Sequence, residues 1–173
     1  MNLVHENNSN VISITLLKQF NRNWNMLRQS IENAPEKHWK EVQIDDSEKV
    51  WSYSWNIFHI IETADFYSRN TPENMEWGKK AGINWDTDLP EVIAEKKDLI
   101  TKLHLKKYLK EIEGRITKIF ESNNDLELLK KDNFHWFQSI YEKYLYLLRH
   151  DMHHIGELNK ALRDWKCKRI SWQ

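Results

Sequence analysis

Glycine and proline are scarce in this chain, which has 4 glycines and 3 prolines among 173 residues. Sandwiches and barrels of β-strands must turn every few residues, and turns use glycine and proline more than other residues. Their scarcity argues against an all-β fold and against disorder of the proline- and glycine-rich kind. The many leucine, lysine, glutamate and isoleucine residues favour long helices joined by a few connections.

The chain also lacks paired cysteines, long apolar runs and an excess of charge of one sign. Its single cysteine, Cys167, excludes an intramolecular disulfide and fits a reducing compartment. No run approaches the about 18 apolar residues of a membrane span, and residues 1–10 lack the apolar core of a signal peptide. The 26 lysines and arginines balance 26 acidic residues, which is not typical of a nucleic-acid binder. We therefore expect a cytoplasmic protein without nucleic-acid or membrane partners.

Four long amphipathic segments predict an all-α protein with a four-helix bundle in one domain, residues 1–173. Ser52 or Ser54 can cap the second helix, and Thr101 is the expected N-terminal cap of the third. Ser139 with Glu142 forms a capping box for the fourth. The long connection between the second and third segments can cross the bundle end, so these helices can run parallel. The expected helices span about residues 10–31, 52–69, 101–122 and 139–164.

The two longer connections carry weaker signals. Residues 33–50 are polar, and one helical turn is expected at residues 35–39. Within residues 70–100, a short helix is expected to begin at Thr71-Pro72-Glu73 and to end at Gly78 and Gly82. Another short helix is expected to begin at Pro90.

Histidines carry the clearest chemical signal in the sequence. His150 and His154 are four residues apart, so on a helix they lie on one face and present two imidazoles to one ion, while His153 is turned away. His59 lies in the middle of the apolar second helix and needs a partner for its ring nitrogens, for which a metal is one solution. A chance pair of solvated histidines and a hydrogen-bonded core histidine are the alternatives.

Other catalytic motifs are missing from the sequence. There is no HExxH helix, no Glu-x-x-His pair of a di-iron bundle, no Walker loop and no Gly-x-Ser-x-Gly. Metalloprotease, ferritin-like and nucleotide-binding chemistry are therefore not expected.

Two segments of the chain resemble the DinB/YfiT-like family of four-helix-bundle proteins. Residues 51–59, Trp-Ser-Tyr-Ser-Trp-Asn-Ile-Phe-His, resemble the family's Trp-Ser segment that leads into the second-helix histidine. Residues 149–158, Arg-His-Asp-Met-His-His-Ile-Gly-Glu-Leu, resemble its fourth-helix pattern His-x3-His-x-Gly-Gln-Leu. Glu157 stands where glutamine is common in the family. The resemblance covers most of the chain.

The resemblance implies a fold and a site. The bundle would run up-down-down-up with the long crossover between helices two and three, and the protein would be a homodimer. His59, His150 and His154 would bind a divalent metal ion. Three neutral imidazoles leave open positions on such an ion, as in catalytic zinc sites. Histidine ligands suit Zn, Ni, Cu or Fe, of which we favour Zn or Ni.

The implied site suggests an enzyme that acts on a small-molecule substrate. An open position can bring the pKa of a bound water towards ~7, or bind and deprotonate a thiol. Some family members transfer a low-molecular-weight thiol such as bacillithiol or mycothiol to an electrophile, and a metal-dependent hydrolase is a close variant. Glu62, one turn from His59, is the candidate catalytic base, with an ion pair or a helix-surface carboxylate as its plainer role. The alternatives are a non-catalytic, stress-associated metal-binding module and a helical dimerisation module.

Overall fold

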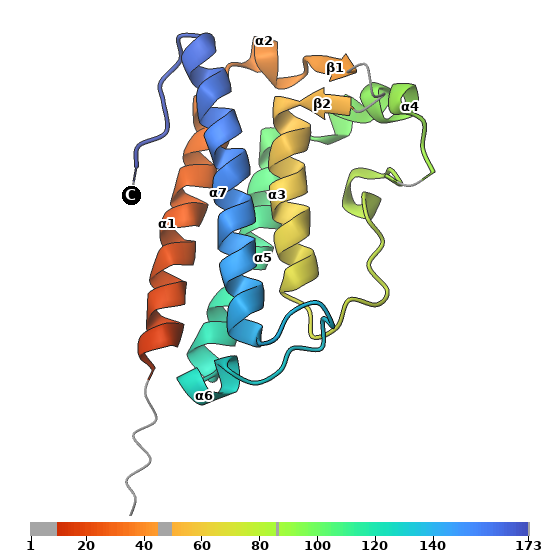
Figure 1. Ribbon diagram of the computed structural model, residues 1–173. Helices are drawn as coiled ribbons and strands as arrows, with labels where there is room; N and C mark the ends of the chain where they lie inside the picture. The colour runs from red at the N-terminus through yellow and green to blue at the C-terminus, as the bar shows by residue number, and fades with distance from the viewer. Residues whose placement is uncertain (1–9, 45–49, 86, 173) are drawn as a thin grey trace, which may run out of the picture.

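The computed structural model describes residues 10–44, 50–85 and 87–172, and it is predominantly helical (Figure 1). Each long helix packs against two others, α1 and α3 both contacting α5 and α7. In Figure 1, α1 and α7 run in one direction, and α3 and α5 run in the opposite direction. The predicted set of four long helices is thus confirmed. These helices are α1 (Val11–Asn33), α3 (Tyr53–Tyr67), α5 (Lys102–Ser122) and α7 (Ile140–Asp164).

Short elements lie in the connections. The turn expected at residues 35–39 is present as α2, but the all-helical expectation missed a two-stranded antiparallel sheet, in which Gln43 pairs with Trp51. Strands of three residues are too short to show an alternating pattern in a sequence. The short elements are α2 (Glu36–Trp39), β1 (Val42–Ile44), β2 (Val50–Ser52), the 3₁₀ turns η1 (Lys79–Ala81) and η2 (Lys96–Leu99), α4 (Pro90–Glu95) and α6 (Asp125–Leu128).

The predicted helix starts are confirmed by their capping hydrogen bonds. The side-chain oxygens of Ser52, Thr101 and Ser139 each accept a hydrogen bond from the backbone N–H three residues later. The capping box differs in one detail, because the Glu142 carboxylate accepts from the backbone N–H of Gln138 rather than from that of Ser139. Local sequence was therefore sufficient to place these three helix starts.

The prediction of a short helix beginning at Thr71 is wrong. The segment instead forms the 3₁₀ turn η1, which lies between Gly78 and Gly82. Both glycines adopt left-handed backbone conformations, with φ of 83° and 67°. A Cβ atom at Gly78 would lie 2.6 Å from the Ile83 Cγ1 atom, so this position also requires glycine for space. Pro90 begins α4 as expected.

Helix α3 lies at the centre of the molecule. Every residue of Tyr53–Tyr67 is buried except His59, which is only partly buried. Helices α5 and α7 cover two sides, and the connection between α3 and α5, described for residues 68–85 and 87–101, passes along another side (Figure 1). Trp85 from this connection contacts the Trp55 ring, with ring centroids 5.3 Å apart. The connection therefore completes the burial of α3.

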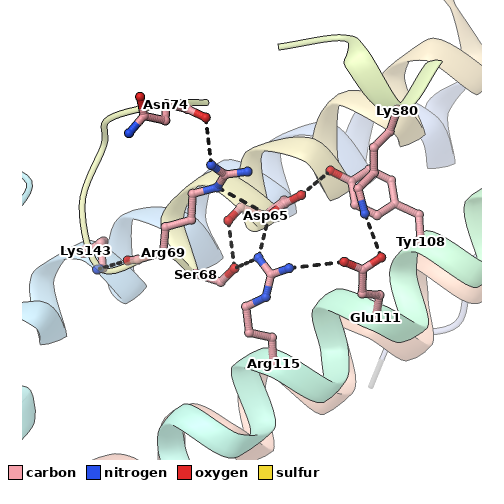
Figure 2. Close-up of polar contacts among 9 residues, drawn as sticks. All are labelled: Asp65, Ser68, Arg69, Asn74, Lys80, Tyr108, Glu111, Arg115 and Lys143. Carbon is pink, nitrogen blue, oxygen red and sulfur yellow. Dashed lines mark hydrogen bonds and ion pairs between the residues drawn. The ribbon is translucent and has the colours of Figure 1, made fainter. Parts of the chain in front are cut away.

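A buried carboxylate ties α3 to α5 (Figure 2). Asp65 accepts hydrogen bonds from the Tyr108 hydroxyl at 2.8 Å and from the Arg115 guanidinium at 2.5 Å. Burial alone would raise the pKa of Asp65, but these two donors hold it below its ordinary value. Arg115 also binds Ser68 and Glu111, so the last turn of α3 is held on α5 by a continuous polar network.

The start of α1 is capped by a distant residue. Asn10 precedes the helix but makes no capping hydrogen bond with its side chain. The backbone N–H groups of Ile12 and Ser13 donate instead to the Asp125 carboxylate, at 3.1 and 3.0 Å. Asp125 belongs to α6, which the sequence did not predict, and its negative charge also suits the positive end of the helix dipole. Among the described helices, none is long and apolar enough to cross a membrane.

Replacing Asp125 with alanine should lower the free energy of unfolding by about 1–2 kcal/mol, because two helix N–H groups lose their acceptor. Urea denaturation followed by circular dichroism measures the change. The control is Glu121→Ala on the exposed surface of α5, which should change the stability by less than about 0.5 kcal/mol. Equal losses in the two variants would contradict the capping role.

Candidate metal centre

The structure brings His59 of α3 together with His150 and His154 of α7. The Nε2 atoms of His59 and His150 are 3.1 Å apart. One nitrogen from each of the three rings lies within 4.8 Å of the other two. Two imidazole nitrogens on one tetrahedral zinc ion lie about 3.3 Å apart, for Zn–N bonds of about 2.0–2.1 Å. The donor set and its spacing therefore fit a divalent ion of the kind that histidine prefers.

The three rings lie at the edge of the core. The side chains of His150 and His154 are 14% and 21% exposed, whereas that of His153 is 70% exposed. The sequence-based expectation that His153 turns away from the centre is confirmed. His59 faces these rings as the one residue of α3 that is not fully buried. The centre thus lies between the buried helix α3 and α7, and it is still reached by solvent.

Burial keeps the three imidazoles neutral. It lowers the pKa of His59 and of His150 to about 4, and neighbouring histidines add to the effect. It also lowers the pKa of His154, although the hydrogen bond to Glu157 opposes the change. Neutral imidazole has one nitrogen with a free lone pair, which is the form that binds metal.

A carboxyl group lies behind each of the two rings of α7. Glu157 Oε2 lies 2.7 Å from His154 Nδ1 and accepts a hydrogen bond from Nδ1–H, which leaves Nε2 with the lone pair. The Asn56 amide donates to the same Glu157 oxygen at 3.2 Å. On the other ring, His150 Nδ1 lies 3.4 Å from Asp151 Oδ1. This arrangement of carboxylate, histidine and ion is common around bound metals.

Asp151 forms a buried polar pair with Asn23 next to the histidines. Its side chain is fully buried, and it accepts a hydrogen bond from the Asn23 amide of α1 at 2.8 Å. Burial raises the pKa of Asp151 well above its ordinary value, and the Asn23 donor opposes the change. This pair connects α1 to α7, the helix that carries two of the histidines.

Sequence reasoning missed the orienting residues Asn56 and Asn23. The positions of Asn56 and Glu157 each contain a usable signal, because Asn56 precedes His59 by three residues and Glu157 follows His154 by three. Residues three apart lie on one helix face. Asn23 has no such signal, since it reaches the site from a helix 128 positions away along the chain.

Glu62 makes its contacts away from the histidines. One of its oxygens accepts from the backbone N–H of Gly78 at 2.5 Å, and the other accepts from the Trp85 indole N–H at 2.9 Å. Both partners belong to the connection that covers α3, so the carboxylate anchors this connection. Within the described part of the chain, no hydrogen bond joins Glu62 to the three histidines. Its predicted role as catalytic base therefore has no direct support from these contacts.

The chain was compared with protein-family models, with curated proteins and with solved structures, and none of the three comparisons gave a match. The resemblance to the DinB/YfiT-like family therefore stays a prediction from the quoted motifs, and the candidate metal centre depends on its geometry.

The buried carboxyl group of Glu62 should make the stability pH-dependent. Burial raises its pKa to about 7, while the Gly78 and Trp85 donors oppose the change. A carboxyl group with a raised folded-state pKa stabilises fully below its unfolded pKa, and this contribution is lost as the pH rises through about 7. Between pH ~4.5 and ~7.5, metal-free wild type should lose up to about 3 kcal/mol relative to Glu62→Gln.

Denaturant unfolding of both proteins across this pH range measures the difference. Taking the difference between the two proteins removes the contribution of the histidines, which both contain. A difference that stays constant with pH would contradict the raised pKa of Glu62.

Proposed function

We propose that this protein binds one divalent metal ion through His59, His150 and His154, and that the ion serves a reaction on a small molecule. The observation that carries the proposal is the convergence of three imidazoles at the one incompletely buried position of α3. A histidine that only filled the core would be enclosed like its neighbours in the helix. This one meets two other histidines where solvent has access.

The site has the form of a catalytic rather than a structural metal site. Among the described residues, no fourth His, Cys, Asp or Glu joins the group of three histidines. Structural zinc sites have four protein ligands, whereas catalytic sites keep a position open. When bound, such an ion supplies a Lewis acid that lowers the pKa of a water or thiol at the open position.

The residues of the chain have separate tasks in this proposal. His59, His150 and His154 hold the ion as neutral ligands. Glu157 keeps the His154 proton on Nδ1, and Asn56 holds Glu157 in place. Glu62 remains the candidate base in the sequence-based hypothesis, but its two contacts favour the anchoring role.

The reaction we favour is transfer of a low-molecular-weight thiol of the bacillithiol type to an electrophile, with metal-dependent hydrolysis as the variant. The motifs shared with the DinB/YfiT-like family support this choice, and so does an open three-histidine site. The directions of the four helices and the long connection between α3 and α5 also agree with the DinB-like topology that the resemblance implies. A homodimer and a cytoplasmic location remain predictions from the sequence.

The metal content of the purified protein tests the ligand set. Wild type without a histidine tag, incubated with Zn²⁺ or Ni²⁺ and desalted, should retain about one ion per chain in elemental mass spectrometry. The His150→Ala variant should retain almost none, because two ligands bind far more weakly than three. The matched control is His153→Ala, which removes an exposed histidine of the same helix and should retain the ion. A wild-type protein that retains no ion after this treatment would contradict the proposal, and a helical interaction module would then be the remaining interpretation.

The Glu157 variants test the orientation of His154. Glu157→Ala should weaken Zn²⁺ binding about 10- to 100-fold, because the ring loses the group that selects its tautomer. Glu157→Gln should fall between this variant and wild type, since the amide oxygen can still accept from Nδ1 but carries no charge. Competition with a chelator of known affinity measures the dissociation constants. Lys160→Ala, an exposed position one turn further along α7, is the control and should bind as wild type does.

Assays of a metal-loaded protein separate the enzymatic proposal from a non-catalytic metal-binding module. Consumption of a thiol together with an electrophile supports the transferase, and hydrolysis without a thiol supports the variant. A stoichiometric ion without either activity across a broad panel would favour the non-catalytic module.

A further inference from the structure

A second group of potential metal ligands lies beside the three histidines. His153, His154 and Glu157 place one ligand atom each within 4.8 Å of one another. His153 Nε2 is 3.5 Å from Glu157 Oε1, and His154 Nδ1 is 2.7 Å from Glu157 Oε2. All three residues belong to α7, where residues three and four apart share one face. We call this group the outer cluster, and His59, His150 and His154 the inner cluster.

The outer cluster lies on the solvent side of the inner cluster. The side chains of His153 and Glu157 are 70% and 44% exposed, whereas His154, which belongs to both clusters, is 21% exposed. A cation that comes from solvent can therefore meet His153 and Glu157 without any movement of the core. The carboxylate supplies negative charge at this position, and the imidazoles select ions such as Zn²⁺ and Ni²⁺ over Mg²⁺.

The two clusters use opposite nitrogens of the His154 ring. The outer cluster includes Nδ1, which now donates a hydrogen bond to Glu157. The inner cluster is left with Nε2. A neutral imidazole has one N–H and one lone pair, so only one of its two nitrogens can bind an ion at a time. Full binding at the outer cluster and full binding at the inner cluster therefore exclude each other.

We propose that His153, His154 and Glu157 form an entry site, at which a divalent cation binds before it passes to the inner cluster. At the entry site, His154 carries its proton on Nε2 and binds the ion through Nδ1. For the ion to pass inward, Nε2 releases its proton to solvent, and Nδ1 takes up a proton from solvent once the ion has left it. Glu157 then accepts the hydrogen bond from Nδ1–H, and the lone pair on Nε2 is free for the ion. The entry role rests on the proposed inner site, whereas ion binding at the outer cluster does not.

The rate of metal loading tests the entry role. Metal-free protein is mixed with Zn²⁺ in a stopped-flow instrument, and a zinc-sensitive dye reports the free ion. His153→Ala should load several-fold more slowly than wild type and still reach the same final stoichiometry and affinity. His135→Ala, which removes an exposed histidine from another part of the chain, is the matched control and should load at the wild-type rate. Loading of His153→Ala at the wild-type rate would overturn the entry role.

Equilibrium binding in a variant without the inner cluster tests the outer cluster itself. His59→Ala/His150→Ala keeps all three outer residues, so it should still bind one Zn²⁺, more weakly than wild type. Adding His153→Ala should abolish this binding. Circular dichroism checks that both variants fold, and if they do not, the loading rates of the folded single variants decide. Absence of binding in the folded double variant would overturn the outer site.

The two arms separate this proposal from the proposed function. If wild type and the double variant bind Zn²⁺ with the same affinity, and His153→Ala abolishes binding in both, the outer site stands and the inner site fails. If wild type binds one ion tightly and His153→Ala changes neither rate nor affinity, the inner site stands and the entry site is overturned.

Discussion

The burial of α3 at every position except His59 is the constraint on which the rest of this structure depends. A helix enclosed by two helices and a long connection cannot leave its charged groups to water, so each carboxylate needs donors from its surroundings. Asp65 takes them from Tyr108 and Arg115 of α5, and Glu62 takes them from Gly78 and Trp85 of the connection. Burying these carboxyl groups costs free energy, and the hydrogen bonds that offset this cost hold α5 and the long connection on α3.

His59 is the one residue of this enclosed helix that is only partly buried. Helix α7 runs antiparallel to α3 and presents His150 and His154 to it, so three rings meet at one point between two rigid elements. Burial keeps the rings neutral, and Glu157 and Asp151 approach the other ring nitrogens. Rigid helices with oriented rings are what a metal site requires.

Glu157 connects the chemistry of the inner and outer clusters. Its carboxylate lies near the exposed His153 with one oxygen and accepts from the half-buried His154 with the other. The resemblance to the DinB/YfiT-like family would place a glutamine here, whose amide offers one acceptor and no charge. A carboxylate can both orient a ligand and attract a cation, so in the proposed site Glu157 would serve the inner and the outer cluster.

Local signals in the sequence determined the four long helices, three of their caps and the shared face of His150 and His154, because these depend on residues a few positions apart. The short helix predicted at Thr71 was wrong, and the strand pair and α6 were missed, since their patterns are too short. Only the tertiary structure decided that His59 meets His150, that Asp125 caps α1, and that Glu62 anchors a connection. These contacts join segments distant in the chain, and the packing of the helices, not the local preference of any residue, brings them together.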